Sequence, residues 1–164
     1  MAKRFSLREF QQNVLNRLQE QASAGDRITT LGVQVGSENW LVDMTEISEV
    51  LEVPRMTPVP LTKSWYRGVA NVRGNIYGII DLAAYTSHAE TAQDAQSRVL
   101  LLGQKYSFNA GLLISRVLGL RNAREWQRSE QDGTERYQDD SGQMWTKLDI
   151  KQLLQQPEFM QIGA

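Results

Sequence analysis

The sequence predicts a mainly β fold built from small barrel-like lobes, with one helix added at each end of the chain. Three observations support this fold class. Apolar residues alternate with period two from residue 27 onward, glycine-containing turns recur about every ten residues, and one pattern occurs twice, 67 residues apart. The 164-residue chain is also long enough to bury a core without disulfides or a metal.

Residues 5–22, FSLREFQQNVLNRLQEQA, are predicted to form an amphipathic helix within an N-terminal extension of residues 1–26. Ser6 and Glu9 have the spacing of a capping box. The apolar residues at steps of three and four are Leu7, Phe10, Val14 and Leu18. Two interpretations of this stripe remain open: it packs on the chain's own domain, or it docks in a groove of a partner.

The β region starts with ITTLGVQV, in which Leu31, Val33 and Val35 alternate with smaller or polar residues as in a half-buried strand. GSEN supplies a turn, WLVDM returns as the second strand, and ISEVLEV fits a short strand or a helical turn. Three prolines exclude a long regular element between residues 54 and 60. Further strands are expected at 68–72, 76–81, 97–103, 108–114 and 116–120.

An internal repeat suggests two similar lobes. VGSENWLVDMTEISEVLEV (35–53) and LGQKYSFNAGLLISRVLGL (102–120) share five identical positions, and both contain I-S-x-V-L after a predicted hairpin. Closing each lobe on itself would remove exposed sheet edges.

The end of the β region is polar. Residues 121–143 are predicted to be a long, mobile surface connection. Asp149 is expected to cap a helix from Ile150 to about Gln155, which Pro157 ends. We therefore expect one domain over residues 27–155 and a tail over 156–164.

Composition argues against several classes of function. The net charge is −1 with basic and acidic residues intermixed, which is not typical of a nucleic-acid binder. No apolar run is long enough to span a membrane, and the N-terminus does not resemble a signal peptide. We expect a cytoplasmic protein without membrane insertion.

The sequence lacks the common catalytic and cofactor-binding motifs. The only histidine is His88, no G-x-S-x-G or phosphate-loop motif occurs, and there is no cysteine to hold zinc. The acidic loop around Asp139 and Asp140 lacks EF-hand spacing. The sequence predicts a non-enzymatic protein with no metal and no cofactor. The alternative is a hydrolase that uses His88 or the Asp139–Asp140 loop, and its sign would be a pocket joining His88 to an acid and a nucleophile.

The stretch GVANVRGNIYGIIDL (68–82) is predicted to form two strands joined by a tight turn at Arg73-Gly74-Asn75. Glycine there supplies a positive φ, and asparagine tolerates similar geometry. Apolar residues on both faces of the second strand indicate that it is covered on both sides, by its own barrel and by the second lobe or a partner. An arginine in such a turn needs a counter-charge, which the pattern alone does not identify.

This stretch resembles the signature of CheW-type chemotaxis adaptors. The matching positions are Gly68, Val69, Asn71, Arg73, Gly74, Asp81 and Leu82. The resemblance covers about residues 27–155, with a poor match over 121–143, and Gly78 stands where the family often has proline. It implies two packed five-stranded SH3-like barrels, interlocked and without catalytic activity.

The resemblance also implies partners. Such adaptors bridge the cytoplasmic tip of a methyl-accepting chemoreceptor and the regulatory domain of a CheA-type histidine kinase, in ring assemblies at membrane-associated receptor arrays. The N-terminal helix, Trp40, Trp65 and the segment 109–128 look closest to PilI-type adaptors of type IV pilus and twitching-motility systems. The alternatives are a CheW-type coupling protein of flagellar chemotaxis or a fragment of a larger kinase, although the start methionine and the closing helix argue against the fragment.

The family pattern suggests candidate sites. It implies an ion pair between Glu49 and Arg73 that shapes a groove. The expected receptor-binding residues are Met44, Ile47, Val50, Val72, Arg73 and Ile76. The expected kinase-binding residues are Gly68, Val99 and Leu100.

Overall fold

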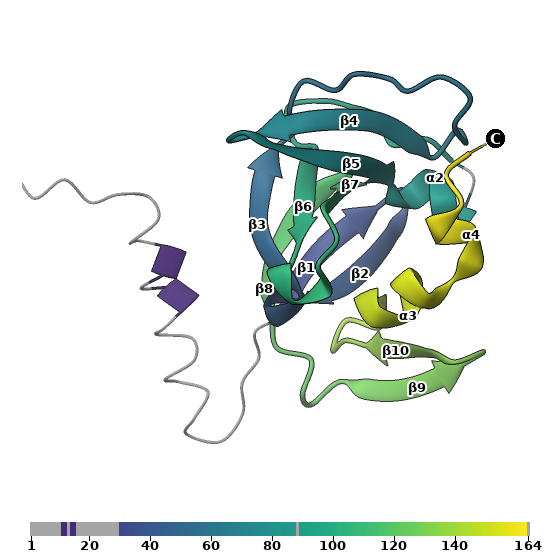
Figure 1. Cartoon of the computed structure of the whole chain (residues 1–164). Coiled ribbons are helices and arrows are strands. Elements are labelled where there is room, and N and C mark those ends of the chain that lie inside the picture. The colour runs from purple at the N-terminus through teal and green to yellow at the C-terminus, as the bar shows by residue number, and fades with distance from the viewer. Residues whose placement is uncertain (1–10, 13, 16–29, 88, 164) are drawn as a thin grey trace, which may run out of the picture.

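The computed structural model describes residues 11–12, 14–15, 30–87 and 89–163, which contain two β-sheets (Figure 1). The first sheet contains β1 (Thr30–Val35), β2 (Glu38–Asp43), β8 (Arg116–Arg121), β9 (Gln127–Gln131), β10 (Thr134–Gln138) and β11 (Met144–Leu148). The second contains β3 (Ile47–Glu52), β4 (Tyr66–Val72), β5 (Asn75–Asp81), β6 (Arg98–Leu102) and β7 (Ala110–Ile114). The short helices are η1 (Met44–Glu46), α2 (Leu82–Ser87), η2 (Gln104–Tyr106), α3 (Ile150–Gln155) and α4 (Pro157–Met160).

The two sheets share one strand order. The first runs β8-β1-β2-β11-β10-β9 and the second runs β3-β6-β7-β5-β4. In each, an antiparallel trio is followed by one parallel neighbour, β11 beside β2 and β5 beside β7, and then by an antiparallel strand. The predicted fold of two five-stranded SH3-like lobes is confirmed, with β9 as an extra edge strand on the first.

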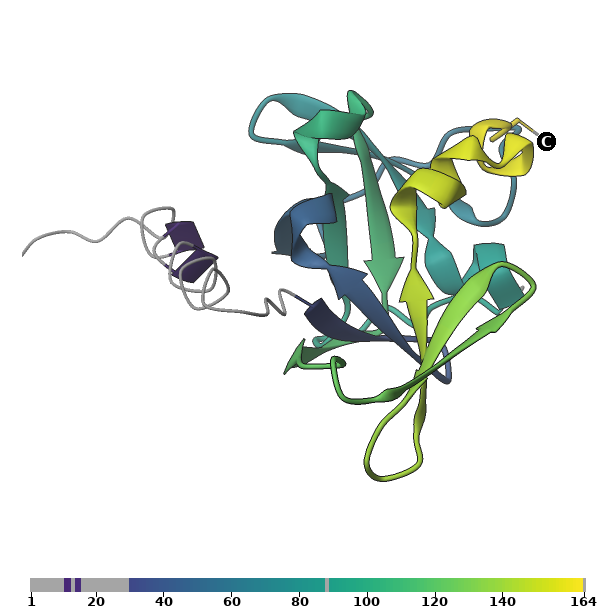
Figure 2. The ribbon, with the colours of Figure 1, turned by 90° about the horizontal axis from the view of Figure 1, so that it is seen from below.

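The order also shows how the lobes interlock. The repeated segments correspond to β1-β2-β3 and β6-β7-β8, but the third strand of each pairs in the other segment's sheet, β3 with β6 and β8 with β1. Figure 2 shows the strands of both sheets side by side in the same body. This exchange makes the two lobes one folding unit.

Apolar side chains fill two cores. The larger lies between the sheets and includes Val33 and Val42 from the first sheet and Ile80 and Leu100 from the second. The buried residues of the smaller core all come from the second sheet and include Ile79. Since neighbours Ile79 and Ile80 point into different cores, β5 is covered on both faces, as its apolar pattern predicted.

Buried Asp81 fixes the end of β5. Its carboxylate accepts hydrogen bonds from the Ala84 N–H at 3.2 Å, from the Thr91 N–H at 2.8 Å and from the Thr91 hydroxyl. Arg67 Nη1 lies 3.6 Å from the second carboxylate oxygen. Asp149 occupies the matching place after β11 and caps α3 as predicted, accepting from the Gln152 N–H at 3.0 Å.

The structure corrects two sequence predictions and adds two elements that the sequence did not predict. Residues 121–143 are not one long connection, because β9 and β10 form a hairpin whose turn, Asp132-Gly133, has φ of 53° and 77°. Strand β11 and helix α2 were missed. Pro157 follows α3 but also begins α4.

No helix in the described part of the chain is long and apolar enough to cross a membrane. The predicted helix over residues 5–22 lies mostly outside the described residues. The four described residues within it, Gln11, Gln12, Val14 and Leu15, are helical.

Candidate partner-binding face

The turn between β4 and β5 carries a paired arginine. Arg73 and Gly74 form its two residues, with φ of 54° and 87°, and the Gly74 N–H donates to the Asn71 side chain at 2.9 Å. The Arg73 guanidinium donates to both carboxylate oxygens of Glu49 in β3, with an Nη1–Oε2 distance of 2.7 Å. This hydrogen bonding raises the pKa of Arg73 above its ordinary value. The Arg73 side chain is still 63% exposed, so it is also available to a partner.

The ion pair lies between the two edge strands of the second sheet. Strands β3 and β4 are its two edges, and the pair joins β3 to the turn after β4. At the middle of β4, Thr57 and Val69 exchange two backbone hydrogen bonds of 2.8 and 2.9 Å. The ion pair and these two bonds therefore connect β4 and its turn to β3 and to the loop that follows β3.

An apolar face lies next to the ion pair, on η1 and β3. Met44, Ile47 and Val50 are partly buried and pack against the larger core. A β-bulge at Ser48 places Ile47 and Val50 on the same face although three positions separate them. We call these three residues the β3 face.

The β3 face lines an apolar cavity of about 210 Å³. Its other lining residues are Ser48, Glu49, Gln11, Val14 and Leu15. Glu49 thus borders the cavity and holds Arg73, so an apolar floor lies beside a charged rim. Such a surface suits the apolar stripe of an amphipathic helix with a polar edge.

The structure separates the other two apolar residues expected in the receptor-binding groove. Val72 packs against the smaller core. Ile76 follows the turn and is 55% exposed. Of the apolar groove residues expected from the family pattern, the structure brings together Met44, Ile47 and Val50 and does not include Val72 among them.

The residues expected to bind the kinase do not form an exposed site. Val99 and Leu100 have no exposed surface and lie on β6, whose backbone pairs with β3 and β7. Their side chains point into the two cores, so the prediction that they contact a kinase does not fit their position. Gly68 allows the loop backbone at Thr57 to approach β4 closely, since a Cβ on residue 68 would lie 2.3 Å from the Thr57 carbonyl oxygen.

The loop between β3 and β4 exposes apolar residues that sequence reasoning missed. Leu61 is 85% exposed, and its backbone has a φ of 60°. Val59 is also exposed. The three prolines between residues 54 and 60 indicated an irregular loop, but they did not indicate that Leu61 would be exposed.

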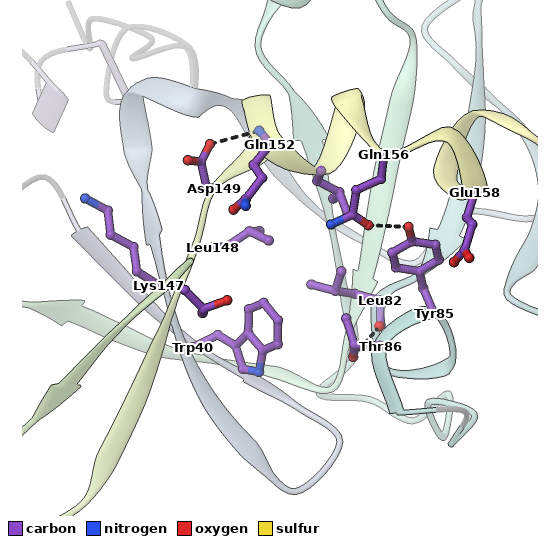
Figure 3. Close-up of a pocket in the computed structure, with 12 residues that line it drawn as sticks. Trp40, Leu82, Tyr85, Thr86, Lys147, Leu148, Asp149, Gln152, Gln156 and Glu158 are labelled. Carbon is purple, nitrogen blue, oxygen red and sulfur yellow. Dashed lines mark hydrogen bonds between the residues drawn. The ribbon is translucent and has the colours of Figure 1, made fainter. Parts of the chain in front are cut away.

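A second cavity, of about 320 Å³, lies among β2, α2, β11 and α3 (Figure 3). Trp40, Leu82 and Leu148 supply apolar surface, and Tyr85 donates a hydrogen bond to Gln156 across it. Asp149 in its wall caps α3. The Tyr85–Gln156 hydrogen bond joins α2 to the end of α3, and the Asp149 hydrogen bond fixes the start of α3.

The acidic loop acts as a turn. The Asp139 carboxylate accepts from the Ser141 hydroxyl and N–H, the Gln143 N–H and the Trp145 indole. These bonds, with that of the Ser141 hydroxyl foremost, lower the pKa of Asp139 to about 2. His88, the other residue of the hydrolase alternative, lies outside the described residues.

A family model described as the CheW-like domain matches residues 29–158. The chain belongs to the CheW-like domain family. The resemblance of residues 68–82 to the adaptor signature was therefore correct.

Individual relatives match over part of the chain. Protein PilI of Pseudomonas aeruginosa is 36% identical over 92 residues, which cover 56% of this chain and 51% of PilI. Protein FrzA of Myxococcus xanthus is 36% identical over 95 residues, which cover 58% of this chain and 54% of FrzA. The chain thus spans about half the length of these two relatives. The chemotaxis protein CheW of Thermotoga maritima is 27% identical over 99 residues, with coverages of 60% and 64%.

A solved structure has the same fold. The scaffolding protein TtCheW from Thermoanaerobacter tengcongensis superposes with a TM-score of 0.62 at 20% identity, covering 73% of this chain and 87% of its own.

Proposed function

We propose that the chain is a non-enzymatic adaptor that couples the cytoplasmic tip of a methyl-accepting chemoreceptor to a CheA-type histidine kinase. The observation that carries this proposal is the β3 face with its Glu49–Arg73 rim, on a fold of the CheW-like family. The similarity to PilI supports a role in the signalling system of type IV pili and twitching motility.

The receptor tip is assigned to the β3 face. A receptor tip is a helical coil, and burying its apolar stripe against Met44, Ile47 and Val50 would supply most of the affinity. Arg73 would select the register, because an exposed guanidinium favours a carboxylate on the incoming helix.

The kinase is assigned to another surface, so that both partners bind together. Because Val99 and Leu100 are buried, we propose that the kinase domain contacts the exposed Leu61 and Val59 instead. These two residues lie in the loop whose Thr57 pairs with β4. The two lobes differ through the extra β9, so contacts with kinase domains are heterologous and can close into rings. Recruitment to receptor arrays at the membrane follows from such contacts.

A flagellar CheW-type role is the second candidate, which the similarity to the chemotaxis protein of Thermotoga maritima favours. Pulldown with receptor tips of both kinds from the same cell distinguishes the two roles. Capture by the pilus-type receptor alone supports the first role, and capture by the flagellar type alone supports the second.

Titration of the receptor tip into variants of the chain tests the face. Ile47→Asp is expected to weaken receptor binding at least about tenfold, because it buries a carboxylate in an apolar contact, and to leave binding of the kinase regulatory domain unchanged. Leu120→Asp is the control, since Leu120 is exposed on β8 of the other sheet. Equal receptor affinity of both variants and the native chain contradicts the proposed face.

A further inference from the structure

The cavity on the β3 face has a second wall that comes from the same chain. Gln11, Val14 and Leu15 lie opposite Met44, Ile47 and Val50. In Figure 1 these helical residues, in purple, lie on the same side of the molecule as β3. Gln12, which lies between Gln11 and Val14 in the sequence, is exposed and does not line the cavity.

The two walls have matching chemistry. Val14 and Leu15 present apolar side chains, and the β3 face is apolar with a charged edge at Glu49. In sequence, Val14 belongs to the apolar stripe that repeats at steps of three and four. This is the type of surface that an incoming partner helix would present to the same residues.

We propose that the N-terminal segment bearing Val14 and Leu15 binds the β3 face of its own chain and competes there with a partner helix. The occupant is the chain's own segment, because it already forms the opposite wall and its tether gives an effective concentration of about millimolar. The role of the competition in receptor binding rests on the proposed function, whereas the contact itself does not.

The contact is suited to displacement. A cavity remains between the walls, and Val14 is still 37% exposed. Apolar surface that stays in contact with water contributes little to binding. A partner helix that fills the cavity more completely therefore replaces the segment.

Disulfide trapping tests the contact directly, because the chain contains no cysteine. The double variant Val14→Cys with Ile47→Cys, oxidised at low concentration, is expected to form an intramolecular disulfide and to migrate faster on a non-reducing gel. The matched control is Gln12→Cys with Ile47→Cys, which is expected to cross-link at least about fivefold more slowly. Equal rates for both pairs, or only disulfide-linked dimers, overturn the intramolecular contact.

Competition is tested with a peptide probe and the full chain. A labelled peptide of residues 5–22 serves as a model helical partner and needs no receptor. It is expected to bind Val14→Asp at least about fivefold more tightly than the native chain, since the internal competitor is disabled, and to lose binding when Ile47→Asp is added. Equal affinity for the native and Val14→Asp chains overturns the competition. If trapping and competition succeed but no receptor tip binds, the proposed function fails and the internal contact stands.

Discussion

Replacing Gly68 with alanine gives the sharpest test of barrel closure. Gly68 has a φ of 129°, and an added Cβ would lie 2.3 Å from the oxygen and 2.8 Å from the carbon of the Thr57 carbonyl. Backbone atoms cannot rotate away as a side chain can, so Thr57 must separate from β4. That movement breaks the two hydrogen bonds between Thr57 and Val69.

The expected cost follows from these contacts. A backbone strain of about 1–3 kcal/mol adds to the loss of two hydrogen bonds at about 1 kcal/mol each. We expect Gly68→Ala to lower the free energy of unfolding by about 3–5 kcal/mol, a large part of the total for a domain of this type. Urea denaturation followed by tryptophan fluorescence measures the difference.

Gly74→Ala is the matched control. Gly74 also has a positive φ, 87°, but nothing lies within 4 Å of its added Cβ. This variant carries the backbone strain alone and should lose about 1 kcal/mol. If Gly68→Ala is no more destabilising than Gly74→Ala, the closure through Thr57 is refuted.

Three further predictions concern charged groups. Asp81→Ala is expected to lose about 3–5 kcal/mol of stability, because it leaves Arg67 and the Thr91 donors without their acceptor. The control Asp149→Ala loses only a helix cap, which is worth about 1 kcal/mol. Equal losses of the two variants in chemical denaturation would contradict this prediction. The lowered pKa of Asp139, about 2, stabilises the fold above the unfolded-state pKa near 3.9, and this contribution disappears as the pH falls towards 2. Asp139→Asn should therefore flatten the pH dependence of the melting temperature between about pH 4 and pH 2, and an unchanged profile would oppose it. Arg73→Ala should weaken receptor binding with little change in melting temperature, since the exposed ion pair adds little stability; a large drop in melting temperature would make the pair structural instead.

Much of the fold was readable from local patterns. Period-two alternation located β1 and β2, and the double-sided apolar pattern of β5 indicated its burial between two cores. Asp149 was recognised as a helix cap because its side chain acts within its own turn. The hairpin of β9 and β10 was missed because β9 is fully exposed and has no apolar alternation, although Asp132-Gly133 is a turn signal.

The site was harder to predict because it depends on contacts distant in sequence. The bulge at Ser48 that brings Ile47 and Val50 together has no clear sequence mark. The family pattern suggests Val99 and Leu100 as kinase-binding residues, yet β6 is an inner strand with neighbours on both sides. The meeting of Val14 with the β3 face joins segments about thirty residues apart, which periodicity alone does not reveal.

The central claim is that one folded chain holds a receptor tip and a kinase regulatory domain at the same time. Size-exclusion chromatography with light scattering on the three purified components measures this directly. We predict a ternary complex whose mass includes all three components. When the chain carries Ile47→Asp, the complex should lose the receptor tip and keep the kinase regulatory domain. A folded chain that binds neither partner, or whose partners exclude each other, would contradict the claim.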